Sequence, residues 1–233
     1  MSATRLEVVL SPAEFAALRE RDLSQTVCVV FDILRASTSM ITALGNGAEA
    51  IIPVAEISEA LAIRKNRPEV LLAGEREGLR IRGDLAGGVE FDFGNSPREF
   101  VAEKVHGRTI VMTTTNGTRA LRACAGAQTV LVSSFLNLRA TYMWITEHRP
   151  ANVILVCSGT FDEPALEDIL AAGAICERVT SVPPAPGSAG VLIPGQPEDR
   201  NRQHRLAHGI ELAESTWEAI LNTALSVGAS VAR

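Results

Sequence analysis

The sequence predicts an α/β fold, with a mainly parallel sheet that carries helices on both of its faces. Short apolar runs rich in Val, Ile and Leu recur along the chain, and helix-forming stretches separate them. This strand–helix alternation is typical of parallel strands joined by crossover helices. Several apolar runs lack alternating polar positions, as expected for strands that are covered on both faces. The 233 residues are enough for one large domain or two small ones.

The first part of the chain supplies four predicted strands. Pro12 follows Ser11, which marks a helix start because proline is favoured at the first helical position. Gly74–Asn95 is a long irregular stretch, and loops of that length are usually functional or mobile. The predicted strands are Leu6–Leu10, Val27–Phe31, Ala50–Val54 and Val70–Ala73, and the predicted helices begin at Ser11 or cover Ala36–Leu44 and Ser58–Lys65.

The second part continues the alternation with three strands and four helices. Ser96, Pro97 and Glu99 combine a cap, a proline at the first position and a capping-box glutamate, so we predict a helix that runs to Gly107. The predicted strands are Thr109–Met112, Thr129–Val132 and Val153–Cys157, and the further helices are Thr118–Cys124, Asn137–His148 and Ala165–Arg178.

The C-terminal part differs in composition. Residues 181–202 are rich in Pro, Gly and Ser, which is typical of a linker or surface excursion. His208–Ala232 is Ala-rich and predicted to be helical. We therefore expect a catalytic α/β domain over residues 1–180, followed by a linker and a helical segment (181–233) packed on it. A single domain over residues 1–233 is the alternative.

Composition and charge restrict the class of partner. The chain has 22 Lys and Arg against 27 Asp and Glu, a net charge of −5, which argues against nucleic-acid binding. No apolar run approaches the roughly 18 residues of a membrane span, and the N-terminus does not resemble a signal peptide. The four cysteines are scattered, so we expect reduced, mostly buried thiols and a cytoplasmic protein. A homo-oligomer is an open alternative to a monomer.

Polar residues gather where the predicted strands end. Ligands of open parallel sheets bind outside the carboxyl ends of the strands, so these residues are candidates for one shared site. Carboxylates, hydroxyls and arginines dominate the set, which suits a small anionic ligand. The candidates are Asp32, Arg35, Ser37, Thr38, Glu75, Arg76, Asp92, Asn95, Thr114, Thr115, Asn116, Gly117, Thr118, Arg119, Asn137, Ser158, Gly159 and Thr160.

The segment Thr113–Arg119 is the most informative of these strand ends. An apolar β-branched run breaks into hydroxyls, Asn116 and Gly117, and a helix-forming stretch follows. At such a crossing, free N–H groups and hydroxyls of a helix N-terminus can hold an anion, and the Arg119 guanidinium adds a fork suited to phosphate or carboxylate. The alternative is a hairpin turn at Asn116–Gly117.

The charged candidates each have a structural alternative. Asp32 could ligate Mg²⁺, accept a proton or attack phosphorus, or it could simply cap the following helix. Arg35 and Arg119 could neutralise phosphoryl oxygens or form surface ion pairs. Glu167 and Asp168 favour the dipole of a helix start, and they point about 100° apart, so only one could face a site squarely.

Five segments together resemble the 2-phosphosulfolactate phosphatase family. Two of their motifs, TTTNGTRA at Thr113–Ala120 and GNSP at Gly94–Pro97, are specific in combination, and the resemblance runs from Val27 to about Cys176. The five segments are Val29–Thr38, Gly74–Arg76, Phe91–Pro97, Thr113–Ala120 and Ala165–Asp168.

The resemblance implies a cytoplasmic, Mg²⁺-dependent phosphatase that converts 2-phospho-3-sulfolactate to 3-sulfolactate and phosphate, in some organisms within coenzyme M biosynthesis. It implies that Asp32, with Glu167 or Asp168, ligates Mg²⁺, and that Arg35 and Arg119 act on the phosphoryl group. The D-x-D pattern of aspartyl-phosphate enzymes is missing at Asp32, which favours attack by water. A phosphatase for another small anionic phosphoester and a non-catalytic anion-binding protein are the alternatives.

Overall fold

The computed structural model describes residues 4–180 and 196–208, together with residues 214 and 218. The chain divides into two compact units, Met1–Pro194 and Gly195–Arg233. In its described part, the second unit consists of helix α8 (Gln196–His208), whereas the first unit holds both sheets of the protein.

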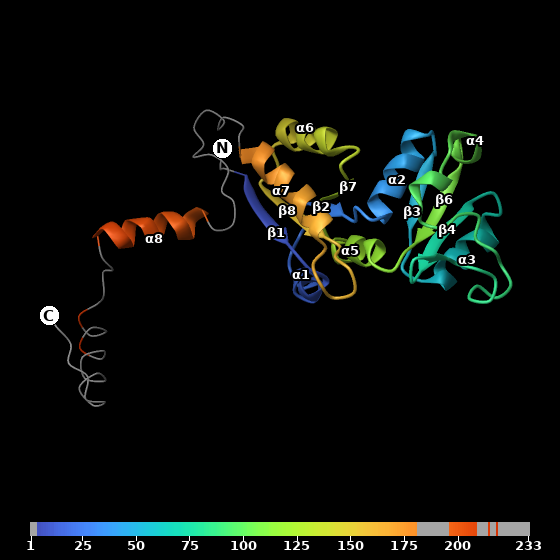
Figure 1. The fold of residues 1–233 in the computed structure, drawn as a ribbon, viewed down its shortest axis with the longest axis horizontal. Coiled ribbons are helices and arrows are strands. Elements are labelled where there is room, and N and C mark those ends of the chain that lie inside the picture. Colours follow the sequence, from blue (N-terminus) through green and yellow to red (C-terminus); the bar gives the residue numbers. More distant parts are fainter. Residues whose placement is uncertain (1–3, 181–195, 209–213, 215–217, 219–233) are drawn as a thin grey trace. The chain divides into compact units, whose positions relative to one another are not determined.

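The first unit confirms the predicted α/β fold class, with strands and helices in alternation (Figure 1). Its strands are β1 (Arg5–Val9), β2 (Thr26–Phe31), β3 (Ala50–Pro53), β4 (Leu71–Arg76), β5 (Leu79–Arg80), β6 (Thr109–Thr113), β7 (Thr129–Ser133) and β8 (Asn152–Cys157). Its helices are α1 (Phe15–Arg19), α2 (Ala36–Gly45), α3 (Ile57–Asn66), α4 (Ala102–Val105), α5 (Gly117–Ala123), α6 (Leu138–His148) and α7 (Leu166–Thr180), with 3-10 turns at Pro12–Glu14 and Pro97–Glu99.

The strands are divided between two sheets. The first sheet has the order β1-β8-β2-β7 and is parallel throughout, with Leu6 and Val27 opposite Val153. The second sheet has the order β3-β6-β4-β5, in which only β5 is antiparallel. The strands of the second sheet are consecutive in the chain and lie between β2 and β7 of the first. Helix α2 leads into the second sheet, and helix α5 leads back to the first.

Both faces of each sheet are covered, which explains the continuous apolar strands. In β2, Val29 and Phe31 pack with residues of α6 and α7, while Cys28 and Val30 pack with α1 and α5 on the opposite face. The second sheet packs with α2 and α4 on one face and with α3 on the other. Burial of each such aliphatic or aromatic side chain contributes about 1.5–3 kcal/mol. Of the cysteines, Cys28, Cys124 and Cys157 are buried, as predicted for thiols in apolar stretches.

The helix predicted from Ser96 to Gly107 is wrong in one respect: it is broken in the middle. A 3-10 turn at Pro97–Glu99 and helix α4 are separated by Phe100, which has φ −90° and ψ 56°. Phe100 is fully buried, and its ring lies 5.1 Å from that of Phe93. Packing of this ring into the core therefore overrides a correctly identified helix start.

The C-terminal predictions are only partly within the described residues. Helix α8 occupies part of the stretch predicted to be a linker, because charged helix formers replace Pro, Gly and Ser after Gln196, and Pro197 lies in the first turn, where proline is tolerated. The domain boundary predicted at residue 180 and most of the helix predicted over His208–Ala232 lie outside the described residues and stay predictions. Across the part of the chain that is described, no helix is long and apolar enough to cross a membrane.

Candidate active site

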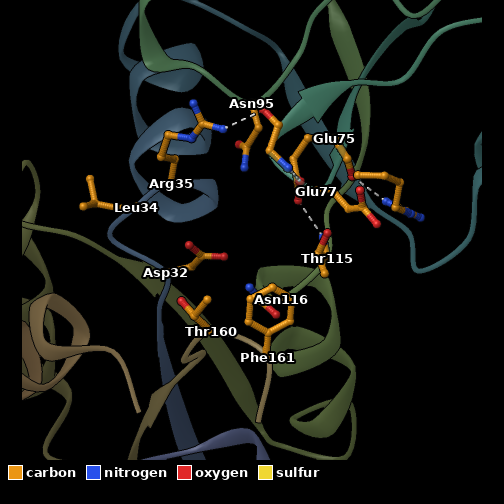
Figure 2. Close-up of a pocket in the computed structure, with 12 residues that line it drawn as sticks. Asp32, Leu34, Arg35, Glu75, Glu77, Asn95, Thr115, Asn116, Thr160 and Phe161 are labelled. Atoms are coloured by element: carbon orange, nitrogen blue, oxygen red, sulfur yellow. Dashed lines mark hydrogen bonds between the residues drawn. The ribbon is translucent and has the colours of Figure 1, made fainter. Parts of the chain in front are cut away.

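The carboxyl ends of strands from both sheets border one cavity of about 480 Å³. The loops after β2 and β8 line it from the first sheet, and the loops after β4 and β6 line it from the second (Figure 2). Eight residues predicted from the sequence lie here: Asp32, Arg35, Glu75, Arg76, Asn95, Thr115, Asn116 and Thr160. The other lining residues are Leu34, Glu77, Gly78 and Phe161.

Asp32 follows the last residue of β2 and is only 7% exposed. Its Oδ1 accepts the N–H of Ala36 at 3.1 Å, and its own N–H donates to Ser37 Oγ at 2.9 Å. The capping alternative for Asp32 is thus correct for one oxygen, which accepts an N–H of the first turn of α2. The side chain also reaches the cavity, as Figure 2 shows, so capping and a role in the site are compatible.

Burial raises the pKa of Asp32 from its ordinary value of 3.8 to about 7. Burial is the largest cause of this rise; the negative charge of Asp168 and, more weakly, that of Glu75 contribute to it, while the Ala36 N–H acts in the opposite direction. A carboxyl group with a pKa near neutrality exchanges protons readily at physiological pH. Such a carboxyl in a cavity is a candidate functional group on physical grounds.

Gly117, the first residue of α5, faces Asp32. A Cβ at this position would lie 2.6 Å from Asp32 Oδ2 and 2.8 Å from Ala36 Cβ, distances that real side chains do not adopt. The close approach brings the N-terminus of α5 against the carboxylate. Strand β6 therefore continues into a helix, which excludes the hairpin alternative for Asn116–Gly117.

Glu75, at the end of β4, is as buried as Asp32 but is held differently. Its Oε1 accepts the N–H of Thr115 at 2.8 Å, and its Oε2 accepts the N–H of Gly78 at 2.8 Å. The carboxylate thereby joins the turn after β4 to the loop after β6. Both of its oxygens are committed to backbone donors, so its role is to fix this wall of the cavity.

The two arginines of the cavity differ in their free donors. Arg76 donates to the carbonyls of Glu75 and Ala55 and to Thr113 Oγ1, at 2.8–3.1 Å. Arg35 donates from Nη2 to the carbonyl of Gly78 at 3.2 Å. A guanidinium has five N–H donors, so Arg35 retains donors for an anionic ligand.

Several buried polar atoms at the cavity have no protein partner. Within the described residues, Asn95 Oδ1, Thr115 Oγ1 and Asn116 Oδ1 are buried without a hydrogen bond, and so is Ser158 Oγ nearby in sequence to Thr160. Leaving a buried polar atom unpaired costs about 1–3 kcal/mol. Three such atoms from two segments around one cavity are the signature of a site that a ligand completes.

The predicted set of acidic metal ligands does not come together. Asp168 is 2% exposed and lies outside the lining, with Oδ1 on the Ile33 N–H at 2.8 Å and Oδ2 on the Gly159 N–H at 3.1 Å. Glu167 does not line the cavity either. In the described part of the chain, no three His, Cys, Asp or Glu side chains are grouped to hold a metal ion.

Two further candidates serve the backbone away from the cavity. Asp92 Oδ2 accepts the N–H of Leu72 at 2.7 Å and pairs with Arg64 at 2.9 Å, which holds the long loop against β4. Asn137 folds the turn before α6, since its Oδ1 accepts the Ser134 N–H at 2.9 Å and its Nδ2 donates to the Val132 carbonyl at 3.0 Å.

Arg119 forms an exposed ion pair, which was the structural alternative to a role in the site. Its Nη2 lies 3.4 Å from Asp162 Oδ1, and the side chain is 45% exposed and outside the lining. The remaining candidates outside the lining support the turns that carry it: they are Ser37, Thr38, Thr114, Gly117, Thr118, Ser158 and Gly159.

Two apolar residues that line the cavity, Leu34 and Phe161, were not predicted, because only polar residues at strand ends carry a sequence signal for an anion site. They are 69% and 75% exposed and are adjacent in the chain to Arg35 and Thr160. Phe161 has a φ of 56°, which is uncommon for an aromatic residue. The Glu77–Gly78 turn was also not predicted, although a Gly two residues after a strand end signals a tight turn.

Comparisons with known proteins show the family of this chain. The family model described as 2-phosphosulpholactate phosphatase matches residues 14–208. A protein of Caldanaerobacter subterraneus subsp. tengcongensis, named "Probable 2-phosphosulfolactate phosphatase", is 45% identical over 170 residues, 72% of this chain and 67% of the relative. A protein of Thermotoga petrophila with the same name is 39% identical over 218 residues, 94% of this chain and 78% of the relative.

Proposed function

Because this chain belongs to the 2-phosphosulpholactate phosphatase family, whose members are phosphoric monoester hydrolases, we propose that it hydrolyses 2-phospho-3-sulfolactate to 3-sulfolactate and phosphate. The structural observation that supports this is the ring of unpartnered buried oxygens beside Asp32. A volume of about 480 Å³ suits a small organic ligand.

The substrate carries a phosphate, a carboxylate and a sulfonate, so its site must hold several oxyanions. Arg35 supplies a guanidinium with free donors, and the N-terminus of α5 presents backbone N–H groups beside Asn116. Asp32 and Glu75 are themselves negative and would repel such a substrate. A bound cation would offset this repulsion.

The proposal therefore includes Mg²⁺, and the lining residues fit that ion. Mg²⁺ prefers hard oxygen ligands and usually binds through one or two carboxylates, several waters and the substrate phosphate. Asp32 supplies a carboxylate, and Asn95 Oδ1, Asn116 Oδ1 and Thr115 Oγ1 are unpaired oxygens. When bound, the ion would polarise the phosphoryl group and acidify a bound water.

The chain's own residues then have separate tasks. Asp32 provides the anionic centre of the site, and Glu75 keeps Thr115 and the Gly78 turn in place. Arg35 orients the substrate through its oxyanions. Leu34 and Phe161 border the mouth, where apolar side chains limit the access of bulk water.

The test is phosphate release from 2-phosphosulfolactate, phospholactate and phosphoglycolate, each with Mg²⁺ and with EDTA. We expect Mg²⁺-dependent turnover with preference for 2-phosphosulfolactate. Equal rates on all three esters would sink the sulfonate assignment, and phosphate binding without turnover would identify a non-catalytic binding protein.

The proposal extends to the biological setting, a cytoplasmic step of coenzyme M biosynthesis. Deletion of the gene in the native host should then deplete coenzyme M and cause accumulation of the phosphoester. Unchanged coenzyme M in the deletion strain would remove this part of the proposal.

A further inference from the structure

Asp168 links two loops of the first sheet although it does not touch the cavity. It lies in the first turn of α7 and is 2% exposed. Oδ1 accepts the Ile33 N–H at 2.8 Å, and Oδ2 accepts the Gly159 N–H at 3.1 Å. Ile33 follows β2 and Gly159 follows β8, two strands that are neighbours in the sheet. One buried carboxylate thus joins the loops that leave adjacent strands.

These two loops carry a large share of the cavity wall. The loop after β2 supplies Asp32, Leu34 and Arg35, and the loop after β8 supplies Thr160 and Phe161. Asp168 therefore bonds to the residue directly after Asp32 and to the residue directly before Thr160. A shift of either loop would move a lining side chain by the same amount.

The loop after β8 has a backbone that needs such an anchor. Gly159 has a φ of 61°, and a Cβ there would lie 2.4 Å from the Glu163 carbonyl oxygen and 2.6 Å from Pro12 Cδ. Thr160 and Glu163 close the turn with backbone hydrogen bonds of 2.9 and 3.1 Å. A backbone conformation outside the commonly populated φ/ψ regions persists only where the surrounding contacts hold it in place.

We propose that Asp168 is a positioning residue of the phosphatase, which sets the separation of Asp32 from Thr160 and Phe161 by holding the Ile33 and Gly159 amides. The inference rests on the proposed function for its catalytic readout. It also gives a physical reason for a buried acid in this place, since a carboxylate can accept both amides whereas an amide side chain can accept only through its single oxygen.

The proposal is tested with Asp168→Asn, in which the new NH₂ group faces an amide donor. Hydrogen exchange followed by NMR should be at least about tenfold faster at the Ile33 and Gly159 amides, while Val29 and Leu155 in the sheet interior keep their protection. With Mg²⁺ and 2-phosphosulfolactate, kcat should fall at least about tenfold, and KM should change less than about threefold because Glu75, Asn95 and Thr115 stay in place.

Glu14→Gln is the matched control. Glu14 Oε1 accepts the backbone amides of Leu10 and Ser11 at 2.9 and 3.3 Å, at the end of β1 on the same edge of the sheet. Its loop carries no lining residue of the cavity. Both amides bond to the same oxygen, and the carbonyl oxygen of Gln can accept them in its place. The same carboxylate-to-amide change should therefore keep both amides protected and leave kcat unchanged.

Wild-type kcat with intact protection in Asp168→Asn would overturn the proposal, and so would equally faster exchange at all amides, which indicates general destabilisation. If Asp168→Asn does not fold, Asp168→Glu is used instead. Protection of one of the two amides with an intermediate kcat supports the proposal. Loss of protection at both amides with a wild-type kcat overturns it. If the wild-type protein itself releases no phosphate, the proposed function fails, and the exchange data still decide whether Asp168 holds both loops.

Discussion

The two sheets meet at the cavity with carboxylates that are equally buried but differently supported. Asp32 on the first sheet and Glu75 on the second are each 7% exposed. Each carboxylate oxygen of Glu75 accepts one backbone N–H, from Thr115 and from Gly78. Asp32 accepts the Ala36 N–H through Oδ1, while Oδ2 faces Gly117. Burial alone therefore does not distinguish a reactive carboxylate from a structural one; the hydrogen bonds to its oxygens do.

The two sheets therefore supply groups with different roles to the cavity. The second sheet presents a wall that is fixed by Glu75 and Arg76, and Asn95 and Thr115, which line the cavity, carry neutral buried oxygens without a hydrogen bond. The first sheet presents the group that titrates near neutrality, Asp32. Substitutions on the two sides of the cavity should thus differ in their effects on activity.

Asp32→Asn should lower Mg²⁺-dependent phosphate release by about 10²–10⁴-fold, the usual range for loss of an acid–base or charged catalytic group. The side chain keeps its size, so circular dichroism and Tm should stay near wild type. Asp84→Asn, the same change at an exposed acid outside the cavity lining, is the control and should retain full activity. Turnover in Asp32→Asn within threefold of wild type would refute the assignment of the reactive carboxylate to the first sheet.

Gly117→Ala should lower kcat/KM by about tenfold to 100-fold and the free energy of unfolding by about 1–3 kcal/mol. The added methyl would meet Asp32 Oδ2 and Ala36, and α5 or the carboxylate must move. Steady-state kinetics and urea unfolding measure the two effects. Gly173→Ala in α7, where a Cβ meets nothing within 4 Å, should leave both quantities unchanged or raise stability slightly.

Arg35→Ala should raise KM for 2-phosphosulfolactate about tenfold, because a hydrogen bond to a charged group contributes about 1.5–3 kcal/mol. Arg119→Ala should change KM less than threefold, since its ion pair with Asp162 is exposed. From the sequence alone, the same two alternatives applied to both arginines. Equal losses in both variants would show that Arg119 reaches the substrate after all.

The smallest effect concerns stability and pH in the metal-free protein. Because the folded pKa of Asp32 is raised from 3.8 to about 7, its contribution to stability is present at low pH and is lost as pH rises from about 4 to about 7. Relative to Asp32→Asn, the wild-type Tm in EDTA should therefore fall by a few degrees across that window. A constant Tm difference from pH 4 to 8 would contradict the raised pKa.

Much of the fold could be predicted from the sequence, because its signals are local. Apolar runs gave the strands, and the caps gave the helix starts. The break at Phe100 could not be foreseen, since it depends on packing against Phe93 in the folded core. The division of the strands into two sheets also depends on tertiary pairing rather than on any local pattern.

The site was predictable where chain position determines it and not where side-chain direction does. Asp32, Asn116 and Thr160 follow strand ends and line the cavity. Asp168 shares its helix turn with Glu167, and only the fold shows that its oxygens accept the Ile33 and Gly159 amides. Apolar contributors such as Phe161 carry no signal of polarity and need the structure to be found.

The order of the strands along the chain has a consequence for folding during synthesis. Strands β3 to β6 form the second sheet from one continuous segment, so their pairings close shorter loops than those of the first sheet. Strand β1 must instead wait for β8, since Leu6 pairs with Val153. Contacts between distant parts of a chain form more slowly than local ones. We therefore expect the second sheet to pair first on the ribosome. The edges of the strands of the first sheet should stay exposed until translation has passed Cys157.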